Sequence, residues 1–237
     1  MDIGDPRAKV KELLQAGDMH RLLRSAASVH GHYCPGLAYG VSAGYAGLKR
    51  LGFENTGMEE LLAVVECNNC FVDGIQVTTG CTFGNNSLIY KDLGKTAVTI
   101  LSRRMKAALR LVLRPGRWES EKATETEKEA ADLFRRVVTE RQDDPEASKR
   151  LHEVWQELSF ETVTKPEEEL FSITNVPAVF PEYAPMVASP RCSECGEQFM
   201  ETKAATGGEQ PLCLTCAGSD VLGVLGGGIR ALTGGKY

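Results

Sequence analysis

The sequence predicts an α+β protein in which helices pack on a small, mostly antiparallel sheet, followed by a small treble-clef or zinc-ribbon module. Three observations support this fold class. Apolar residues recur at helical spacing before residue 52 and again between residues 120 and 163. Short apolar or alternating runs typical of strands lie between residues 61 and 114, and two Cys-x-x-Cys pairs stand near the C-terminus.

Proline and glycine indicate where the helices begin and end. Pro6 suits a first helical turn and Gly17 a stop, so a first helix is expected between them. The other helices are expected over Met19–Val29, over Pro35–Leu51 with Gly52 as the stop, and as a charged pair over residues 120–163 that restarts at Pro145.

The helix predicted over Pro35–Leu51 carries glycines four residues apart, at Gly36, Gly40 and Gly44. Each lowers helix stability by roughly 1 kcal/mol relative to alanine, so a compensating contact is expected. We expect a neighbouring backbone or a ligand to approach closely along this stripe.

Four segments have the composition of strands. They are Leu61–Glu66, Ser87–Lys91, Thr96–Leu101 and Ala108–Arg114. Because Asp92–Lys95 is a good hairpin turn, we expect the last three strands to form an antiparallel meander. Val72–Thr79 is expected to form a short helix that ends at Gly80.

Overall composition excludes several classes of protein. With 42% apolar and 25% charged residues among 237, the chain is neither disordered nor a coiled-coil rod. Its net charge of −5 argues against a general nucleic-acid binder. No apolar run approaches the roughly 18 residues of a membrane span, and the N-terminus lacks the features of a secretory signal. A cytoplasmic protein with no membrane partner is therefore expected.

Changes in composition divide the chain into four parts. Five prolines between residues 166 and 190 mark an extended connector, in which Glu169–Thr174 is a strand candidate. The expected parts are a core domain over residues 1–165, the connector over 166–188, a four-cysteine module over 189–217 and a glycine-rich, poorly ordered tail over 218–237.

The four cysteines of the C-terminal module have the spacing of a structural zinc site. Two Cys-x-x-Cys pairs are separated by 17 residues, and each pair forms a tight turn that directs two thiolates at one tetrahedral ion. Gly207 and Gly208 fit the tip of a hairpin between the pairs. The alternatives are two disulfides or four buried thiols. The predicted ligands are Cys192, Cys195, Cys213 and Cys216.

A second group of metal-binding residue types occurs near the N-terminus. His30, His32 and Cys34 alternate along the chain, so an extended backbone would project all three to one side. Cys34 precedes a predicted helix, where the helix dipole favours a thiolate that is both nucleophile and soft-metal ligand. The alternative is that these residues are buried and hydrogen-bonded in a tight turn.

Three further candidates follow the first predicted strand: Cys70, Asp73 and Cys81. We expect this segment to bring them to Cys34 and His32 and to complete one catalytic or metal-binding site. The Cys67-x-x-Cys70 pair could also be a redox motif, but the helix after it is shorter than in thioredoxin-like proteins. Cys67 alone is interpreted as structural.

These residues resemble the FmdE family, whose name comes from a component of tungsten and molybdenum formylmethanofuran dehydrogenases. The matching motifs are His30–Gly36, Cys70–Gln76, Thr79–Gly84 and Asp92–Lys95, in the family's order. The stretch from Glu169 to Cys216 also resembles the zinc-finger extension of many members.

The resemblance implies an α+β core, often a homodimer, with a cleft lined by His and Cys residues that binds a second metal, zinc or another transition metal. One departure is Gly84-Asn85-Asn86-Ser87, where the family usually has Gly-Lys-Gly-Asn, so a fixed positive charge is lost. The residues carried over are His30, His32, Cys34, Cys70, Asp73, Gln76, Cys81 and Lys95.

The leading functional hypothesis is a metal-binding FmdE-like protein that is accessory to a molybdenum or tungsten formylmethanofuran dehydrogenase-like system. His30 or Asp73 would then carry protons for metal- or thiol-based chemistry. Dehydrogenase activity of this chain alone is not expected, because it lacks a multi-cluster cysteine run. The alternatives are an interaction protein that docks through its zinc module and, with less support from the charge, a nucleic-acid-binding regulator.

Overall fold

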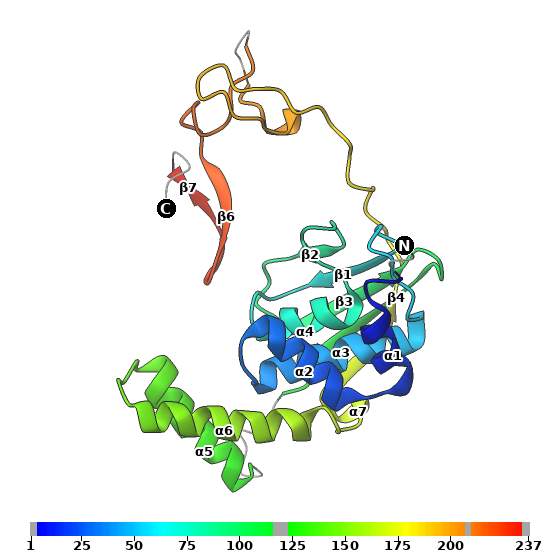
Figure 1. Ribbon diagram of the computed structural model, residues 1–237, viewed down its shortest axis with the longest axis vertical. Coiled ribbons are helices and arrows are strands. Elements are labelled where there is room, and N and C mark those ends of the chain that lie inside the picture. The colour runs from blue at the N-terminus through cyan, green and yellow to red at the C-terminus, as the bar shows by residue number, and fades with distance from the viewer. Residues whose placement is uncertain (1–3, 116–122, 207–209, 234–237) are drawn as a thin grey trace. The chain divides into compact units, whose positions relative to one another are not determined.

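The computed structural model describes residues 4–115, 123–206 and 210–233 (Figure 1). The chain divides into two compact units, with the boundary between Phe180 and Pro181. The first unit therefore extends beyond residue 165, where the sequence placed its end, because a strand at residues 171–176 still belongs to its sheet. None of the helices among these described residues is long and apolar enough to cross a membrane.

Three helices open the first unit. They are α1 (Ala8–Ala16), α2 (Met19–His30) and α3 (Pro35–Leu51). Gly17 ends α1 in the left-handed conformation, with φ of 66°, as its position predicts. Asp18 caps the start of α2 by accepting a hydrogen bond from the backbone N–H of Arg21.

The sheet of the first unit has the order β2-β1-β3-β4-β5 and is mostly antiparallel, as predicted. The prediction of a hairpin between β2 and β3 is wrong. β1 lies between them, parallel to β2 and antiparallel to β3, because the Lys91–Thr96 loop bonds to the end of β1 at Val65 and Glu66. The strands are β1 (Leu61–Val65), β2 (Leu88–Tyr90), β3 (Ala97–Ser102), β4 (Ala107–Leu113) and β5 (Phe171–Val176).

Helix α3 packs closely on α4 (Cys70–Thr79) along the glycine stripe, as the sequence predicts. A Cβ atom at Gly40 would collide with the backbone oxygen of Phe71, and one at Gly44 with the Thr78 hydroxyl. The contact is reciprocal, because a Cβ on Gly74 of α4 would meet the Leu37 oxygen. The absence of side chains lets the two backbones touch, which fixes the ends of α3 and α4 relative to each other.

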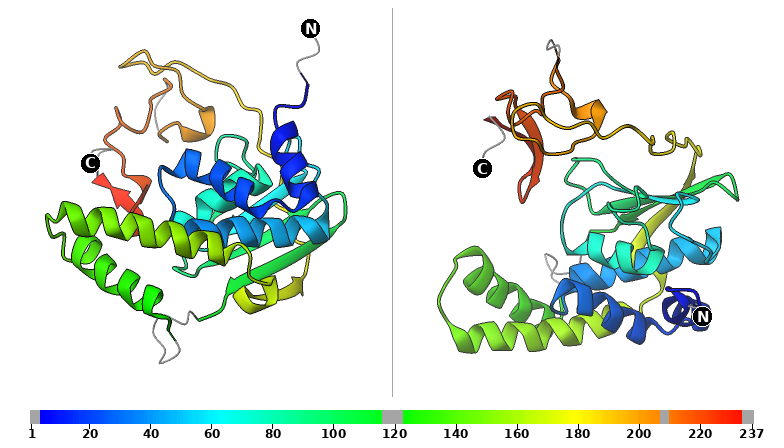
Figure 2. Two further views of the ribbon diagram at one scale, coloured as in Figure 1. Left: turned by 60° about the horizontal axis from the view of Figure 1, so that its bottom comes forward. Right: turned by 45° about the horizontal axis from the view of Figure 1, so that its top comes forward.

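Helices cover one face of the sheet (Figure 2), and its other face carries a small apolar cluster of Leu62, Leu101 and Ala108. The segment after β5 folds back on this cluster through Ala178 and Phe180. Short helix α7 (Glu167–Leu170) leads directly into β5, so the connector predicted from its prolines begins only after the sheet is complete.

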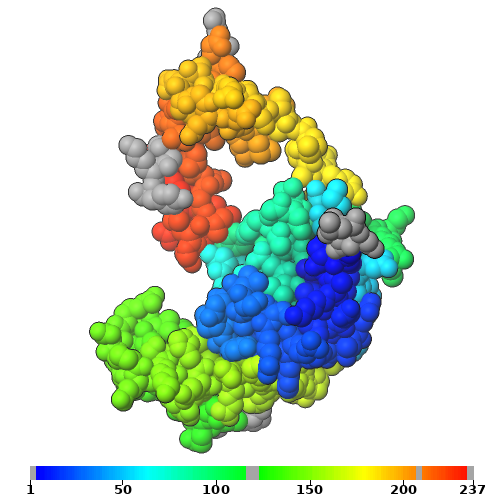
Figure 3. All heavy atoms as spheres, viewed as in Figure 1, coloured from blue at the N-terminus to red at the C-terminus, as the bar shows by residue number. Residues whose placement is uncertain are grey.

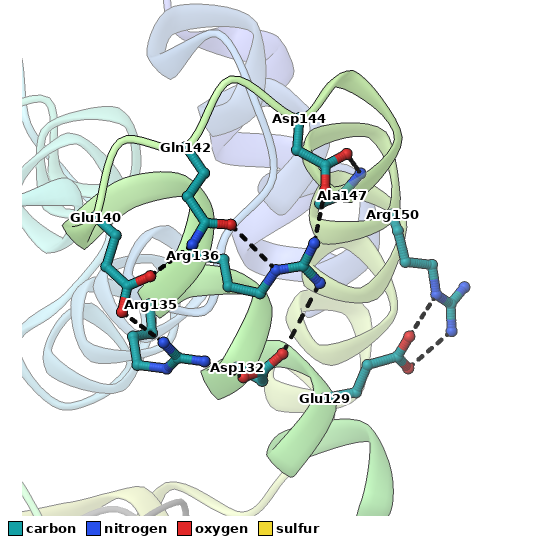
Figure 4. A network of polar contacts seen from close by, with 9 residues as sticks. All are labelled: Glu129, Asp132, Arg135, Arg136, Glu140, Gln142, Asp144, Ala147 and Arg150. Carbon is teal, nitrogen blue, oxygen red and sulfur yellow. Dashed lines mark hydrogen bonds and ion pairs between the residues drawn. The ribbon is translucent and has the colours of Figure 1, made fainter.

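Residues 124–162 form an antiparallel helical hairpin, α5 (Glu125–Phe134) and α6 (Pro145–Thr162), which extends beyond α1 and α2 (Figures 2 and 3). A π-helical turn, Arg135–Thr139, ends the first arm. At the tip Arg136 binds Asp144 at 2.6 Å, and Asp144 in turn caps α6 (Figure 4). We call residues 124–162 the helical hairpin.

The second unit contains the four predicted ligand cysteines and a separate β-hairpin, β6 (Val221–Leu225) with β7 (Gly228–Leu232). The tail expected to be poorly ordered is therefore a regular hairpin over these residues. Two isolated bridges, Arg191 with Gln198 and Ala204 with Cys213, flank the cysteines, and the short 3₁₀ helix η3 spans Glu201–Lys203. The expected hairpin tip at Gly207–Gly208 lies outside the described residues.

Candidate metal centre

Cys34 and Cys70 stand at the starts of two touching helices. Cys34 is the N-cap residue of α3 in an extended conformation, and Cys70 is the first residue of α4. Gly36 lets the two residues approach each other, because it has no side chain between them. A Cβ placed there would lie 3.1 Å from Cys70 Cβ and 3.9 and 4.0 Å from the sulfurs of Cys70 and Cys34. Glycine at this position leaves room for both thiols.

The two histidines reach the thiols through the turn between α2 and α3. His30 is the last residue of α2, Gly31 reverses the chain with φ of 96°, and His32 follows in the turn. The extended segment expected for these residues is therefore absent, yet they converge. The ligand atoms of His30, His32 and Cys34 all lie within 4.8 Å of one another.

A carboxylate orients the first histidine. Asp73 Oδ2 lies 2.7 Å from His30 Nδ1, and Gln76 donates to the other carboxylate oxygen at 3.2 Å. With Nδ1 engaged by Asp73, His30 presents Nε2 to Cys34 Sγ at 3.7 Å. A carboxylate–imidazole pair aimed at a third group is the arrangement that orients both metal-ligating and catalytic histidines.

The two thiols polarise each other. A hydrogen bond shared with Cys70, together with burial, raises the pKa of Cys34. The same hydrogen bond, assisted by His30, lowers the pKa of Cys70 to about 6. The sequence expected Cys34 to be the thiolate, but the structure favours Cys70, because Cys34 is the more enclosed of the two thiols.

Two aromatic residues of the helical hairpin complete the surroundings of His32. Trp155 stacks on the His32 ring with centroids 5.6 Å apart, and the ring centroid of His152 lies 6.0 Å from that of His32. Burial lowers the pKa of His32, and the nearby imidazoles of His30 and His152 lower it further. His152 and Trp155 are not among the residues predicted from the sequence, because nothing local signals that a helix so much later in the chain returns to this turn.

Cys81 does not join the group. It follows the C-terminal end of α4, whereas Cys70 begins that helix, and ten helical residues separate such positions by about 15 Å. Its fully buried thiol contacts the Leu61 oxygen at 3.5 Å and the Asn55 amide at 3.9 Å. Burial raises the pKa of Cys81 to about 12. The expectation that Cys81 is a catalytic residue or metal ligand is corrected accordingly.

The other residues singled out by the sequence have local roles. The Cys67 thiol donates to Asn69 at 3.5 Å, whereas Cys70 pairs with Cys34, so a redox pair of Cys67 and Cys70 is not favoured. Lys95 lies beside Glu66 at the end of β1. Asn85, in the stretch that departs from the family pattern, braces its own loop by bonding Thr82 and the Gly80 oxygen.

The cysteines of the second unit form a compact four-sulfur group. All four Sγ atoms lie within 4.8 Å of one another, close to the roughly 3.8 Å expected between thiolates on one tetrahedral zinc. Backbone N–H groups of Cys213 and Cys216 approach the sulfurs of Cys192 and Cys213 at 3.5 and 3.4 Å. This group could hold a metal such as zinc.

The core group fits a transition metal as well. With Zn–S and Zn–N distances of about 2.3 and 2.0 Å, a thiolate and an imidazole on one ion lie about 3.5 Å apart. The separation of 3.7 Å between Cys34 Sγ and His30 Nε2 is close to this value. Mixed sulfur and imidazole donors suit zinc, copper, iron and nickel rather than magnesium or calcium.

The fold and these two groups define the class of protein: an α+β domain with a candidate His/Cys metal centre, linked to a four-cysteine module. A family model described as "FmdE, Molybdenum formylmethanofuran dehydrogenase operon" matches residues 29–172. The chain belongs to the FmdE family.

Two similar proteins extend this comparison. A protein of Archaeoglobus fulgidus named "Probable S-adenosyl-L-methionine-binding protein" is 42% identical over 219 residues, which cover 90% of this chain and 57% of that protein. The chain thus spans little more than half the length of this relative. The crystal structure of a protein from Syntrophus aciditrophicus, similar to the FmdE component of a tungsten formylmethanofuran dehydrogenase, superposes with a TM-score of 0.53 at 22% identity, covering 84% of this chain and 92% of that one. This second likeness shows the fold.

Proposed function

We propose that the core group binds a transition metal and that this site is the functional centre of the protein. The donors are the imidazoles of His30 and His32 and the sulfur atoms of Cys34 and Cys70. The observation that carries the proposal is the chain of contacts Asp73–His30–Cys34, with distances of 2.7 and 3.7 Å. Such a chain fixes the ring orientation and directs Nε2 at the Cys34 sulfur, so that one ion could bind both atoms.

A bound metal would act as a Lewis acid that polarises a small substrate or lowers the pKa of a bound water. The residues of this chain supply the rest of the chemistry. Asp73 holds the His30 proton at Nδ1, and Gln76 keeps the carboxylate in place. Trp155 covers one side of His32 and limits the access of bulk water to that ring.

Metal analysis of the full chain tests this proposal. Exchange of Cys192 and Cys195 for serine removes two ligands of the second unit and leaves the core group intact. We expect one equivalent of transition metal to remain, and to be lost when Cys34→Ser is added. A chain that retains no metal after the first two exchanges would refute a core metal site.

We further propose that the protein is a cytoplasmic accessory component of a molybdenum or tungsten formylmethanofuran dehydrogenase-like system and is a homodimer. Membership of the FmdE family supports the accessory role. Affinity purification of the native protein from cell extract tests it: enzyme components with a pterin-bound metal should co-purify in stoichiometric amount. Sedimentation velocity of the purified chain tests the dimer.

A second candidate function is protein docking through the second unit. Its β6–β7 hairpin exposes apolar side chains, since Leu222 is 78% and Val224 54% exposed. Such side chains on a two-stranded sheet are typical of a surface that another protein covers. Exchange of both residues for serine should abolish co-purification and leave the core metal bound. Retained co-purification would exclude this surface.

A further inference from the structure

A third histidine faces the core group from the helical hairpin. His152 and Trp155 lie three residues apart on α6 and therefore on one side of that helix. Trp155 contacts both imidazoles, stacked on His32 at 5.6 Å and edge-on to His152 at 6.4 Å. The indole thus holds the two histidine rings in one cluster, although they belong to segments far apart in the sequence.

The spacing of His30 and His32 matches shared binding of one ion, and the spacing of His32 and His152 is about 1 Å longer than such binding requires. Two imidazoles on one metal, with M–N of about 2.0–2.1 Å, have ring centres about 5 Å apart. The centroids of His30 and His32 are 4.4 Å apart, and those of His32 and His152 are 6.0 Å apart. A shift of about 1 Å at the exposed His152 side chain would therefore bring its ring to this distance from His32.

We propose that His152 is a further ligand of the core metal, contributed by α6, so that metal binding ties the helical hairpin to the α+β core. This inference rests on the proposed function. It gives the site three imidazoles and two thiolates. Five donors favour a metal that accepts more than four ligands over zinc in its usual tetrahedral structural geometry.

Cobalt(II) is a suitable probe, because its visible d–d absorption is weaker in five-coordinate than in tetrahedral sites. The experiment uses the full chain with Cys192→Ser and Cys195→Ser, so that only the core site is observed. We expect His152→Ala to weaken cobalt binding at least about tenfold and to intensify the d–d bands. His20→Ala is the matched control, because His20 on α2 packs edge-on against Phe160, outside the group.

Hydrogen exchange provides a second measurement that does not depend on activity. Cobalt should slow amide exchange in Pro145–Thr162 of the parent chain, and His152→Ala should abolish this protection. Circular dichroism checks that the exposed substitution leaves the fold intact. Unchanged affinity, spectrum and protection in His152→Ala would overturn this inference and leave the core site in place. The absence of cobalt binding in the parent chain would instead refute the proposed function.

Discussion

The contact between α3 and α4 makes the strongest quantitative prediction. At Gly40 a Cβ atom would collide with the backbone oxygen of Phe71, and a backbone cannot yield without separating the helices. Overpacking of this kind destabilises a folded protein by up to about 3 kcal/mol. The higher helix propensity of alanine offsets about 1 kcal/mol of this loss. The substitution Gly40→Ala should therefore lower the free energy of unfolding by about 2 kcal/mol.

Gly47→Ala is the matched control in the same helix. Its Cβ would come closest to the terminal Cδ1 of Ile100, a side-chain atom that can shift more readily than a backbone, while the gain in helix propensity is the same. We expect a net change within about 1 kcal/mol. Urea unfolding of the full chain, followed by far-ultraviolet circular dichroism, measures both variants.

The same pair of variants tests the link from packing to the site. Separating α3 from α4 at Gly40 moves Cys70 relative to Cys34, so cobalt affinity of the core should fall in Gly40→Ala and stay unchanged in Gly47→Ala. Equal stability and equal cobalt affinity of the two variants would refute the reasoning that the glycine stripe positions the thiols.

Three other predictions concern single side chains. Asp73→Asn should weaken core cobalt binding by about 10–100-fold and leave the four-cysteine group unaffected, as shown by two-site metal titration. Cys81→Ser should leave core cobalt affinity unchanged, because that thiol lies at the far end of α4. A lower cobalt affinity in this variant would show that Cys81 belongs to the site. Arg110 binds Glu66 through two contacts of 2.7 Å and lowers the pKa of that carboxyl. Because the folded-state pKa of Glu66 is lowered, its ionised form contributes stability at pH values above the unfolded-state pKa of about 4.3. This stability is lost as the pH falls through the lowered folded-state pKa. Glu66→Gln should therefore destabilise the chain at neutral pH and progressively less in acid, as measured by thermal unfolding from pH 3 to 7.

Local patterns in the sequence predicted the elements well. Stop residues such as Gly17 and Gly52 end their helices where expected, and the start of α3 follows from Pro35. The sheet order could not be found in this way. Asp92–Lys95 has the composition of a hairpin turn. Whether that turn joins neighbouring strands or passes around the end of β1 depends on hydrogen bonds that Lys91 and Lys95 donate to the carbonyl oxygens of Val65 and Glu66, which lie far away in the sequence.

The candidate site shows the same division between local and distant information. The spacing of His30, His32 and Cys34 marked a cluster, although its geometry comes from the turn at Gly31. His152 and Trp155 carry no local signal, since helix residues that face a partner look like any other partly apolar positions. Only the path of the helical hairpin back to α2 and α3 brings them to His32.

The contrast between Cys70 and Cys81 explains why one expected ligand belongs to the site and the other does not. Both flank α4, and the sequence offers no reason to prefer either. The helix separates its ends by about 15 Å, so only one end can meet the start of α3. The glycine contacts show which end of α4 this is. Gly36 lies against Cys70 at the start of α4, and Gly44, two turns later in α3, lies against Thr78 near the other end. Because α3 and α4 run in the same direction along this contact, the start of α3 meets the start of α4. Cys34 is therefore paired with Cys70.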